Sequence, residues 1–550
     1  MMRTGTGPIT GKILSISGPT VSTDLKGLRL YERVYVGYAM LTGEVVRLDH
    51  DRAVIQVYEE TRGLASGEPV KGAGHPLSVR LGPGLLSGMF DGLQRPLRRL
   101  REEMGPFITG GREIYGLDYQ KKWQFSPISK EQDVTSPGDN LGSVKEGAFS
   151  HYIIAGPDDR GRIAKIRQGD FSLDEALGEY DDGRMIVGCH EWPVRSPRPY
   201  RKKLPPSGPL VTGQRSIDFL FPIAKGGTAI FPGGFGTGKT ILEQSIAKFA
   251  DVDLVVYVGC GERGNEMAEM IEEFEDLRDP WTGRQLMERT ILVVNTSNMP
   301  VAAREASIYT AVTMAEYYRD MGYHVLFLAD SLSRWAEALR EISSSLEEMP
   351  GEEGYPTYLA SRLSGFLERA GVVETLGGRT GSLTMILSVS PPGGDFTEPV
   401  TQACLRTTGT FLMLDTALAH RRHYPAINWF QSYSLYATEL AGYFREIVSP
   451  EWETQQQRCR EVLQKEETLR EVSEIVGAEG LQDSDRLLML IADKIRTEFL
   501  SQNAYGEDAF SPPEKTFASI SGIFAYYDRM LGKIAQGLSL DEALTQEGGA

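Results

Sequence analysis

The strongest chemical signal in the sequence is a glycine-rich stretch of eight residues. It reads Gly233-Gly234-Phe235-Gly236-Thr237-Gly238-Lys239-Thr240 and fits the phosphate-binding pattern GxxxxGK[ST] at every fixed position. An apolar run, 228–231, precedes it and a helix-like run, 241–246, follows it, as this motif requires. Glycines let backbone N–H groups wrap phosphates, Lys239 neutralises the β- and γ-phosphates, and the Thr240 hydroxyl binds Mg²⁺. The stretch therefore predicts a site for ATP or ADP with Mg²⁺.

Asp330 is the candidate for the second magnesium ligand. Residues 324–329 form an apolar run that is typical of a strand buried on both faces. Asp330 then falls at the carboxyl end of this strand, where ligands bind in open α/β sheets. Taken alone, Asp330 would more often be the N-cap of the following helix. With the glycine-rich stretch upstream, we predict that it holds the metal ion.

Glu262 is the candidate for the group that orients water during hydrolysis. The apolar run 254–258 predicts another buried strand, and Glu262 and Arg263 follow it closely. A carboxylate beside the γ-phosphate can polarise the attacking water, while Arg263 can counter its charge or contact phosphate. From spacing alone, a carboxylate that starts a helix is an equally good interpretation.

The elements that position these residues predict a multidomain α/β protein. Strand, glycine-rich turn and helix repeat from about 205 to 430, which is typical of a parallel sheet. The first 75 residues contain short β-rich runs such as 44–48 and 53–58, which predict a small barrel, with a linker at 72–76. A second β-rich module follows, and the last part of the chain is helical. Its apolar stripe consists of Leu487, Ile491, Ile495 and Phe499.

These patterns give five predicted segments. They are an N-terminal β-barrel at 1–75, a linker or start of the nucleotide-binding domain at 76–109, a β-rich insertion at 110–190, a P-loop nucleotide-binding domain at 191–434 and a helical domain at 435–550.

The composition excludes several classes of protein. Apolar residues make up 41% of the chain and charged residues 24%, as in an average soluble globular protein. The net charge of -17 disfavours general binding to nucleic acid, a polyanion. We find no apolar run of the roughly 18 residues that a membrane span needs. The four cysteines are far apart and lack CxxC spacing, which favours a reducing compartment such as the cytoplasm.

Several sequence blocks together resemble the catalytic A subunit of V/A-type rotary ATPases. Besides the glycine-rich stretch, these blocks are 261–267, 333–341, 348–356, 390–396 and 421–429. The resemblance runs over nearly the whole chain. It implies a RecA-like nucleotide-binding domain, and it identifies 110–190 as the bulge that distinguishes A subunits from the β subunits of F-type ATP synthases.

The resemblance also implies roles for single residues. Glu262 is the expected catalytic carboxylate, with Arg263 as its neighbour in the site. Tyr424 and Phe510 match aromatic positions that border adenine, although core packing gives the same pattern. Gly234 stands where Pro or Ala is usual, and Thr237 stands where Ala, Ser or Cys is common. The residue at position 237 favours a bacterial or archaeal source.

The resemblance further implies a hetero-oligomeric machine. Three A and three non-catalytic B subunits alternate in a ring, and each B subunit supplies an arginine to the ATP site, so this chain alone should hydrolyse ATP poorly. A central shaft, a peripheral stator and, indirectly, a membrane sector that moves H⁺ or Na⁺ complete the machine. We expect the chain on the cytoplasmic side of a membrane, attached through the complex, and without nucleic acid.

Three alternatives remain at this stage. A type III or flagellar protein-export ATPase shares the core fold but would lack the 110–190 insertion. A Rho-like RNA translocase is disfavoured by the charge of -17. A nucleotide-binding paralogue that only builds the ring is disfavoured by the joint presence of Lys239, Glu262 and Asp330.

Overall fold

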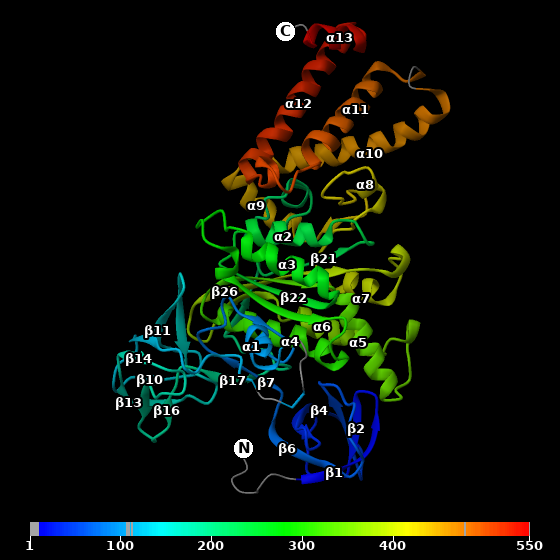
Figure 1. Ribbon diagram of the computed structural model, residues 1–550. Coiled ribbons are helices and arrows are strands. Elements are labelled where there is room, and N and C mark those ends of the chain that lie inside the picture. The colour runs from blue at the N-terminus through cyan, green and yellow to red at the C-terminus, as the bar shows by residue number, and fades with distance from the viewer. Residues whose placement is uncertain (1–9, 106–109, 112–113, 478–479, 549–550) are drawn as a thin grey trace. The chain divides into compact units, whose positions relative to one another are not determined.

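The computed structural model describes residues 10–105, 110–111, 114–477 and 480–548, and it forms two compact units (Figure 1). The first unit contains the chain up to residue 205 together with 252–391 and 395–407. The second unit contains 206–251, 392–394 and the chain from 408 onward. None of the described helices combines the length and apolarity that crossing a membrane requires.

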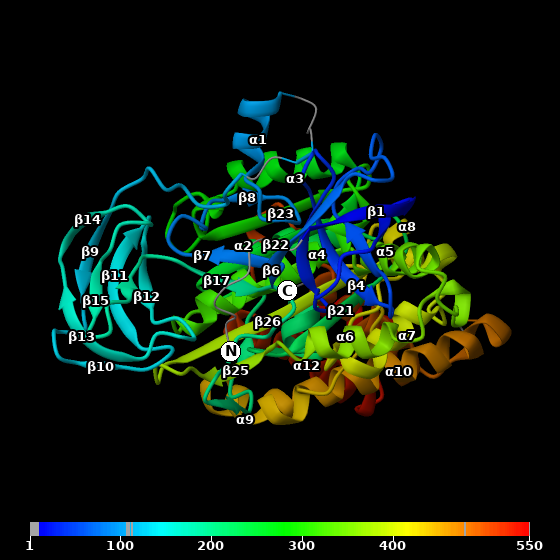
Figure 2. The same ribbon diagram turned by 90° about the horizontal axis from the view of Figure 1, so that it is seen from below.

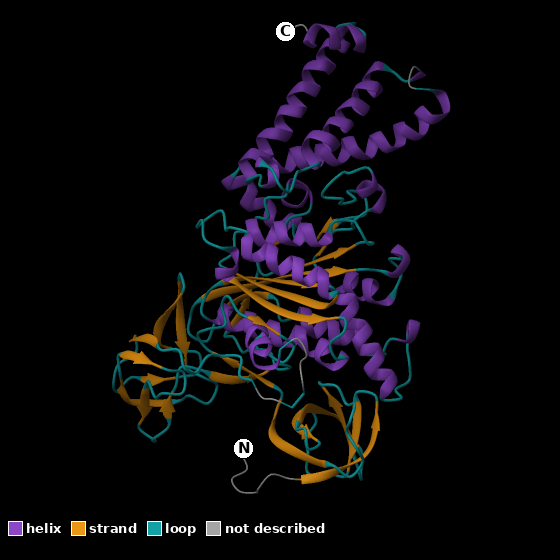
Figure 3. Cartoon of the chain, in the orientation of Figure 1, coloured by secondary structure: helices purple, strands orange, loops and turns teal. Residues whose placement is uncertain are grey.

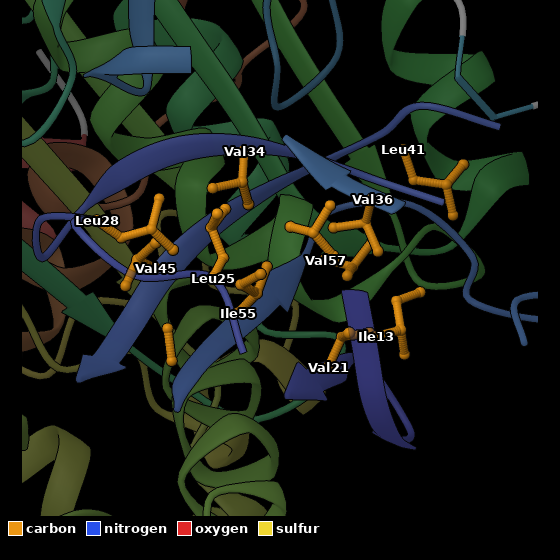
Figure 4. Packing of buried hydrophobic residues seen from close by; sticks show 12 residues of the cluster. Ile13, Val21, Leu25, Leu28, Val34, Val36, Leu41, Val45, Ile55 and Val57 are labelled. Carbon is orange, nitrogen blue, oxygen red and sulfur yellow. The ribbon is translucent and has the colours of Figure 1, made fainter. Parts of the chain in front are cut away.

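The first unit begins with a closed β-barrel, which confirms the predicted N-terminal barrel. Its strands follow the order β1-β2-β5-β4-β3-β6 and are β1 (Thr10–Ser17), β2 (Thr20–Thr23), β3 (Glu32–Val36), β4 (Leu41–Leu48), β5 (Ala53–Val57) and β6 (Pro69–Pro76). Successive side chains of a strand point to opposite faces, so every second residue reaches the interior. Val34, Val36, Val45, Ile55 and Val57 point toward one another there and are fully buried (Figure 4).

The predicted linker at 72–76 is wrong, because these residues form the end of β6. This strand pairs with both β1 and β3 and so closes the barrel. The glycines that suggested a linker have a packing role instead. A Cβ on Gly72 would lie 2.9 Å from Oε1 of Glu32, and the same oxygen accepts a hydrogen bond from the backbone N–H of Gly74 at 3.0 Å.

The region after helix α1 (Leu97–Met104) forms the predicted β-rich insertion (Figure 2). It contains two four-stranded sheets, with the orders β12-β11-β9-β14 and β10-β13-β15-β16. The strands are β9 (Trp123–Pro127), β10 (Val134–Thr135), β11 (Asn140–Glu146), β12 (Phe149–Ile154), β13 (Gly161–Ile166), β14 (Gly169–Phe171), β15 (Gly178–Tyr180) and β16 (Met185–Ile186). The chain returns through β17 (His190–Pro193), which pairs with β7 (Ser78–Leu81).

A parallel sheet forms the centre of the first unit, as the buried apolar runs predicted. Its neighbouring strands are β26 (Thr380–Val389), β24 (His324–Asp330), β22 (Leu254–Glu262), β23 (Thr290–Thr296) and β8 (Met89–Phe90). Two antiparallel strands extend it, β25 (Gly371–Glu374) and β18 (Lys202–Leu204). Besides α1, the described helices of this unit are α3 (Gly264–Asp276), α4 (Val301–Asp320), α5 (Leu332–Ser345), α6 (Leu359–Leu367) and α7 (Pro399–Thr407), with short turns at Leu286–Arg289 and Glu352–Gly354.

The second unit combines a small sheet with the helical end of the chain (Figure 3). Strand β21 (Thr228–Pro232) pairs in parallel with β27 (Thr410–Phe411), which pairs with β28 (Tyr433–Ser434), and β19 (Pro209–Leu210) pairs with β20 (Ile223–Ala224). The helices are α2 (Lys239–Phe249), α8 (Thr416–His420), α9 (Ala437–Ile447), α10 (Trp452–Val476), α11 (Asp483–Lys494), α12 (Pro513–Ala535) and α13 (Leu540–Gly548). Further helical turns span Ser216–Leu220, Pro392–Gly394, Ile495–Leu500 and Glu507–Ala509.

The predicted apolar stripe of the helical end is confirmed. Leu487, Ile491, Ile495 and Phe499 are all fully buried, because residues four apart share one face of a helix. The preceding helix, α10, ends at Val476, and Gly477 follows it as the C-cap.

Candidate functional site

The phosphate-binding loop lies between β21 and α2 in the second unit. Strand β21 is buried throughout and ends at Pro232, and helix α2 begins at Lys239. Gly236 and Gly238 have φ angles of 79° and 83°. Only glycine adopts this left-handed conformation without a steric penalty, so the sequence turns sharply here and aims the first N–H groups of α2 at the loop.

Two side chains close this loop upon itself. The ammonium group of Lys239 donates hydrogen bonds to the carbonyl oxygens of Gly233 at 2.7 Å and Gly234 at 2.9 Å. The hydroxyl of Thr237, which is 2% exposed, donates to the same Gly234 oxygen at 2.9 Å. These hydrogen bonds hold the ammonium group of Lys239 at the loop, where the N–H groups at the start of α2 also attract anions.

The two predicted adenine neighbours lie at different places in the second unit. A Cβ on Gly238 would lie 3.4 Å from the ring of Tyr424, so Tyr424 borders the loop. Phe510 stacks on Phe249 with ring centroids 5.5 Å apart, at the end of α2 that is opposite to the loop. Its ring also fills the space beside Gly213, where a Cβ would lie 2.1 Å away. Contact of either ring with adenine stays a prediction.

The predicted carboxylates lie at the carboxyl edge of the sheet in the first unit. Glu262 is the last residue of β22 and Asp330 is the last residue of β24. These strands pair in parallel, with Gly259 opposite Asp330. The Ser388 hydroxyl at the end of β26 donates to Oδ1 of Asp330 at 2.7 Å. Asp330 is 7% exposed and is therefore held in one orientation.

The environment of Glu262 suits a base that works near neutral pH. Burial, followed by the negative charge of Asp330, raises the pKa of Glu262 from 4.5 to about 7, although the positive charge of Arg334 opposes this shift. A base is most effective when its pKa lies near the working pH. Arg263 is 66% exposed and pairs with Glu266 at 3.4 Å, so its guanidinium remains reachable from solvent.

Each of the two predicted Mg²⁺ ligands, taken separately, is of a type that suits Mg²⁺ bound together with a nucleotide. Among the described residues, no three His, Cys, Asp or Glu side chains cluster closely enough to hold a metal ion by themselves. Mg²⁺ usually takes one or two protein ligands, with phosphate and water oxygens supplying the others. Asp330 offers a buried carboxylate, and Thr240 offers a hydroxyl in the first turn of α2.

Arg334 and Ser388 are site residues that the sequence reasoning missed. Arg334 lies in the first turn of α5, which begins two residues after Asp330, so a cation at the start of the helix that follows the strand was an available signal. Ser388 lies near the end of the apolar run of β26, the strand beside β24. The structure thus brings Glu262, Asp330 and Arg334 together in the first unit, and Gly234, Thr237 and Lys239 together in the second. That the two groups form one site stays a prediction.

Family models match four segments of the chain. They are the beta-barrel domain of the ATP synthase alpha/beta family at 13–74, the ATP synthase alpha/beta subunit barrel-sandwich domain at 114–195, the nucleotide-binding domain of the ATP synthase alpha/beta family at 213–434 and the C-terminal domain of V and A type ATP synthase at 441–544.

Similar proteins match the chain from end to end. The A subunit of the A-type ATP synthase of Methanopyrus kandleri is 52% identical over 98% of this chain and 92% of its own length. That of Thermococcus onnurineus is 51% identical over 97% and 93%. The solved structure of the assembled ATPase EscN, from the type III secretion system of enteropathogenic E. coli, shares the fold, with a TM-score of 0.67 at 22% identity over 93% of this chain and 99% of that one. With archaeal relatives at about half identity and a V/A-type C-terminal domain, the chain belongs to the family of A-type ATP synthase A subunits.

Proposed function

We propose that this chain makes and hydrolyses ATP at a site built from the loop Gly233–Thr240 and the carboxylates Glu262 and Asp330. The observation that carries the proposal is the placement of these carboxylates at the ends of β22 and β24, with the pKa of Glu262 raised to about 7. Membership of the A-type ATP synthase family supports it. The ATPase EscN of a type III secretion system shares the fold, at 22% identity.

Hydrolysis is an in-line attack of water on the γ-phosphate, and synthesis is its reverse. The backbone N–H groups of residues 233–240 bind the phosphates, and Lys239 takes up charge on the β- and γ-phosphates. Glu262 accepts a hydrogen bond from the attacking water and orients it. Arg263 balances the negative charge near the transferred group.

Thr240 and Asp330 are the residues that would hold Mg²⁺. When bound, the ion neutralises charge on the phosphate oxygens. The Ser388 hydroxyl fixes the orientation of the Asp330 carboxylate through its hydrogen bond of 2.7 Å. Tyr424 and Phe510 border the adenine, and the contact of Tyr424 with the loop at Gly238 supports the first of these roles.

The proposed assembly alternates this chain with a non-catalytic B subunit in a ring of three plus three. The B subunit supplies an arginine to each ATP site, and a central shaft and peripheral stator connect the ring to a membrane sector that moves H⁺ or Na⁺. The chain would then lie on the cytoplasmic side of the membrane, attached through the complex. The match to the C-terminal domain of V and A type ATP synthases supports this membership.

The test is Mg-ATP hydrolysis by the chain alone and by the chain mixed with its B partner. We expect activity only in the mixture, because the isolated chain lacks the arginine that contributes roughly 10³ to 10⁵ in rate. Glu262→Gln should abolish activity in the mixture. Glu266→Gln is the matched control. Glu266 lies in the first turn of α3, four residues after Glu262, and this variant should retain most of the activity.

Two outcomes would overturn the proposal. Full activity of the chain alone would point to a self-assembling ATPase of the export type. An intact complex that binds ATP but does not hydrolyse it would point to a nucleotide-binding subunit that only builds the ring.

A further inference from the structure

The peptide before Glu262 occupies a slot between two arginine side chains. Gly261 has a φ of 77°, and the pairing of β22 with β23 shifts register between Cys260 and Glu262. A Cβ on Gly261 would lie 2.7 Å from Cβ of Arg334 and 2.9 Å from Cδ of Arg304. The turn that presents Glu262 is therefore confined on two sides by arginine stems.

Arg304 also holds the other side of Glu262. It lies in the first turn of α4 and is 8% exposed. Its Nη2 donates a hydrogen bond to the Ser297 carbonyl oxygen at 3.0 Å, and the Ser297 N–H donates to the Glu262 carbonyl oxygen at 2.8 Å. Arg304 thus contacts Gly261 directly and reaches Glu262 through one residue, Ser297.

The charge of Arg304 is not used in an ion pair. No carboxylate of the described residues lies within 4.0 Å of its guanidinium nitrogens, and its buried Nε has no hydrogen-bond partner. Burying a guanidinium without an anion is costly. The other arginine of the same helix, Arg319, is buried in an ion pair, with its Nη2 2.7 Å from Oδ1 of Asp320. The side chain of Arg304 is thus buried without an ion pair, against Gly261 and the Ser297 carbonyl oxygen.

We propose that Arg304 is a positioning residue for the reaction, which holds the Gly261–Glu262 turn at the place from which Glu262 orients water. The proposal rests on the proposed function, because it assigns a role relative to Glu262. Arg304 itself contacts neither water nor nucleotide in this proposal. Its loss leaves the Glu262 carboxylate present but free to move, and a displacement of about 1 Å in such a group can cost 10²-fold in rate.

The test compares Arg304→Gln and Arg304→Lys in the complex with the B partner. We expect Arg304→Gln to lower kcat by about 10- to 100-fold while the Kd for ATP changes by less than about threefold. Arg304→Lys keeps a donor for the Ser297 carbonyl and should recover part of kcat. The acid side of the pH profile of kcat/KM should move in Arg304→Gln, because the surroundings of Glu262 change.

Arg319→Gln is the matched structural control, since it removes a buried arginine from the far end of the same helix. It should lower Tm and leave both kcat and the pH profile of the folded complex unchanged. The wild-type complex and Glu262→Gln test the proposed function separately. If the wild type hydrolyses ATP and Glu262→Gln does not, the outcome for Arg304 concerns positioning alone.

A kcat for Arg304→Gln within about twofold of wild type would overturn the proposal. So would a loss of active complex with an unchanged pH profile, since that is a folding defect. If Arg304→Gln does not assemble, Arg304→Lys decides. A slow Arg304→Lys complex with normal ATP affinity supports the positioning role, and full kcat overturns it.

Discussion

Glu262 and Asp330 end two strands that pair in parallel, β22 and β24, where burial and then the charge of Asp330 raise the pKa of Glu262. Parallel pairing places the carboxyl ends of both strands at one edge of the sheet. Burial disfavours the charged form of Glu262 most, and the nearby negative charge of Asp330 disfavours it further, so the pKa of Glu262 lies near neutral. The pairing of β22 with β24 therefore places a proposed metal ligand, Asp330, near a proposed base, Glu262.

The pH dependence of hydrolysis should reflect Glu262. The base form of a carboxyl group is present above its pKa, so kcat/KM should rise with pH and reach half its maximum near 7. The positive charge of Arg334 lowers the pKa of Glu262, so Arg334→Gln should move this midpoint to higher pH. The measurement is the rate of Mg-ATP hydrolysis by the complex between pH 5.5 and 9.

Arg340→Gln is the control for that shift. Arg340 lies on the same helix as Arg334, and its guanidinium lies 4.8 Å from the centre of the Tyr355 ring. It should leave the midpoint in place. An equal shift in both variants would show that the overall charge of α5, and not the contact with Glu262, sets the midpoint.

Glu262 should also weaken the folded state at alkaline pH. Its pKa is about 7 in the folded chain against an ordinary value of 4.5, so the folded chain binds this proton more tightly. The stability contributed by Glu262 therefore falls as pH rises from 4.5 to 7. Glu262→Gln should be more stable than wild type at pH 8, by up to about 3 kcal/mol at 1.36 kcal/mol per pKa unit, and nearly equal at pH 4.5.

Denaturant unfolding of the nucleotide-free chain at pH 4.5 and pH 8 measures this difference. Glu266→Gln should change stability by less than about 0.5 kcal/mol at both pH values, because Glu266 is half-exposed. A Glu262→Gln variant that is less stable than wild type at pH 8 would contradict the raised pKa.

Local patterns were sufficient to predict the strands that carry the site. The apolar run before Asp330 predicted β24 to its last residue, because a strand buried on both faces needs continuous apolar side chains. Strand β22 continues beyond the predicted run 254–258 and ends at Glu262. The glycines of the loop predicted its turn, because Gly236 and Gly238 have positive φ angles that other residues rarely adopt.

Tertiary packing decided the features that the sequence did not reveal. Arg304 is about forty residues from Gly261 in the chain, and only the crossing of α4 over the sheet brings them together. The end of β6, residues 72–76, looked like a linker because glycine and proline are rare inside strands, and only the packing of Gly72 against Glu32 explains a glycine there. Phe510 shows the same ambiguity, since an aromatic residue that stacks on Phe249 and one that stacks on a base have the same sequence signal.

Tyr424 and Phe510 should both contribute to nucleotide affinity. Loss of a ring that stacks on a base costs about 1 to 3 kcal/mol, so Tyr424→Ala and Phe510→Ala should each raise the Kd for ATP by roughly 5- to 150-fold. Isothermal titration with ATP measures this change. Inorganic tripolyphosphate is the control ligand, because it has no base and its Kd should not change.

The stacking of Phe510 on Phe249 offers another role for this ring, which is packing of the protein core. A Phe510→Ala chain with reduced Tm and an unchanged Kd for ATP would show that this ring only packs the core. Phe249→Leu tests the partner ring, and it should lower Tm without changing the preference for ATP over tripolyphosphate.

Arg195 should be essential to the stability of the first unit. Its Nη2 lies 2.9 Å from Oε2 of Glu44 on the barrel and 2.7 Å from Oε2 of Glu305 on α4, and both carboxylates are nearly fully buried. Tyr58 donates a further hydrogen bond to Glu44 at 2.8 Å. Arg195→Met leaves two buried carboxylates without a cation, which should cost about 3 to 5 kcal/mol, measured by denaturant unfolding.

The size of that loss, and its recovery when the carboxylates are removed too, distinguish a buried ion pair from simple packing. Arg62→Met removes the same side chain from an exposed pair with Glu60 and should cost no more than about 1 kcal/mol. Glu44→Gln and Glu305→Gln together should recover part of the loss in Arg195→Met, because no charge is then left buried without a partner. No recovery would mean that the contacts of the Arg195 guanidinium with the rings of Tyr31 and Tyr309, and not its pairing with the carboxylates, account for the stability.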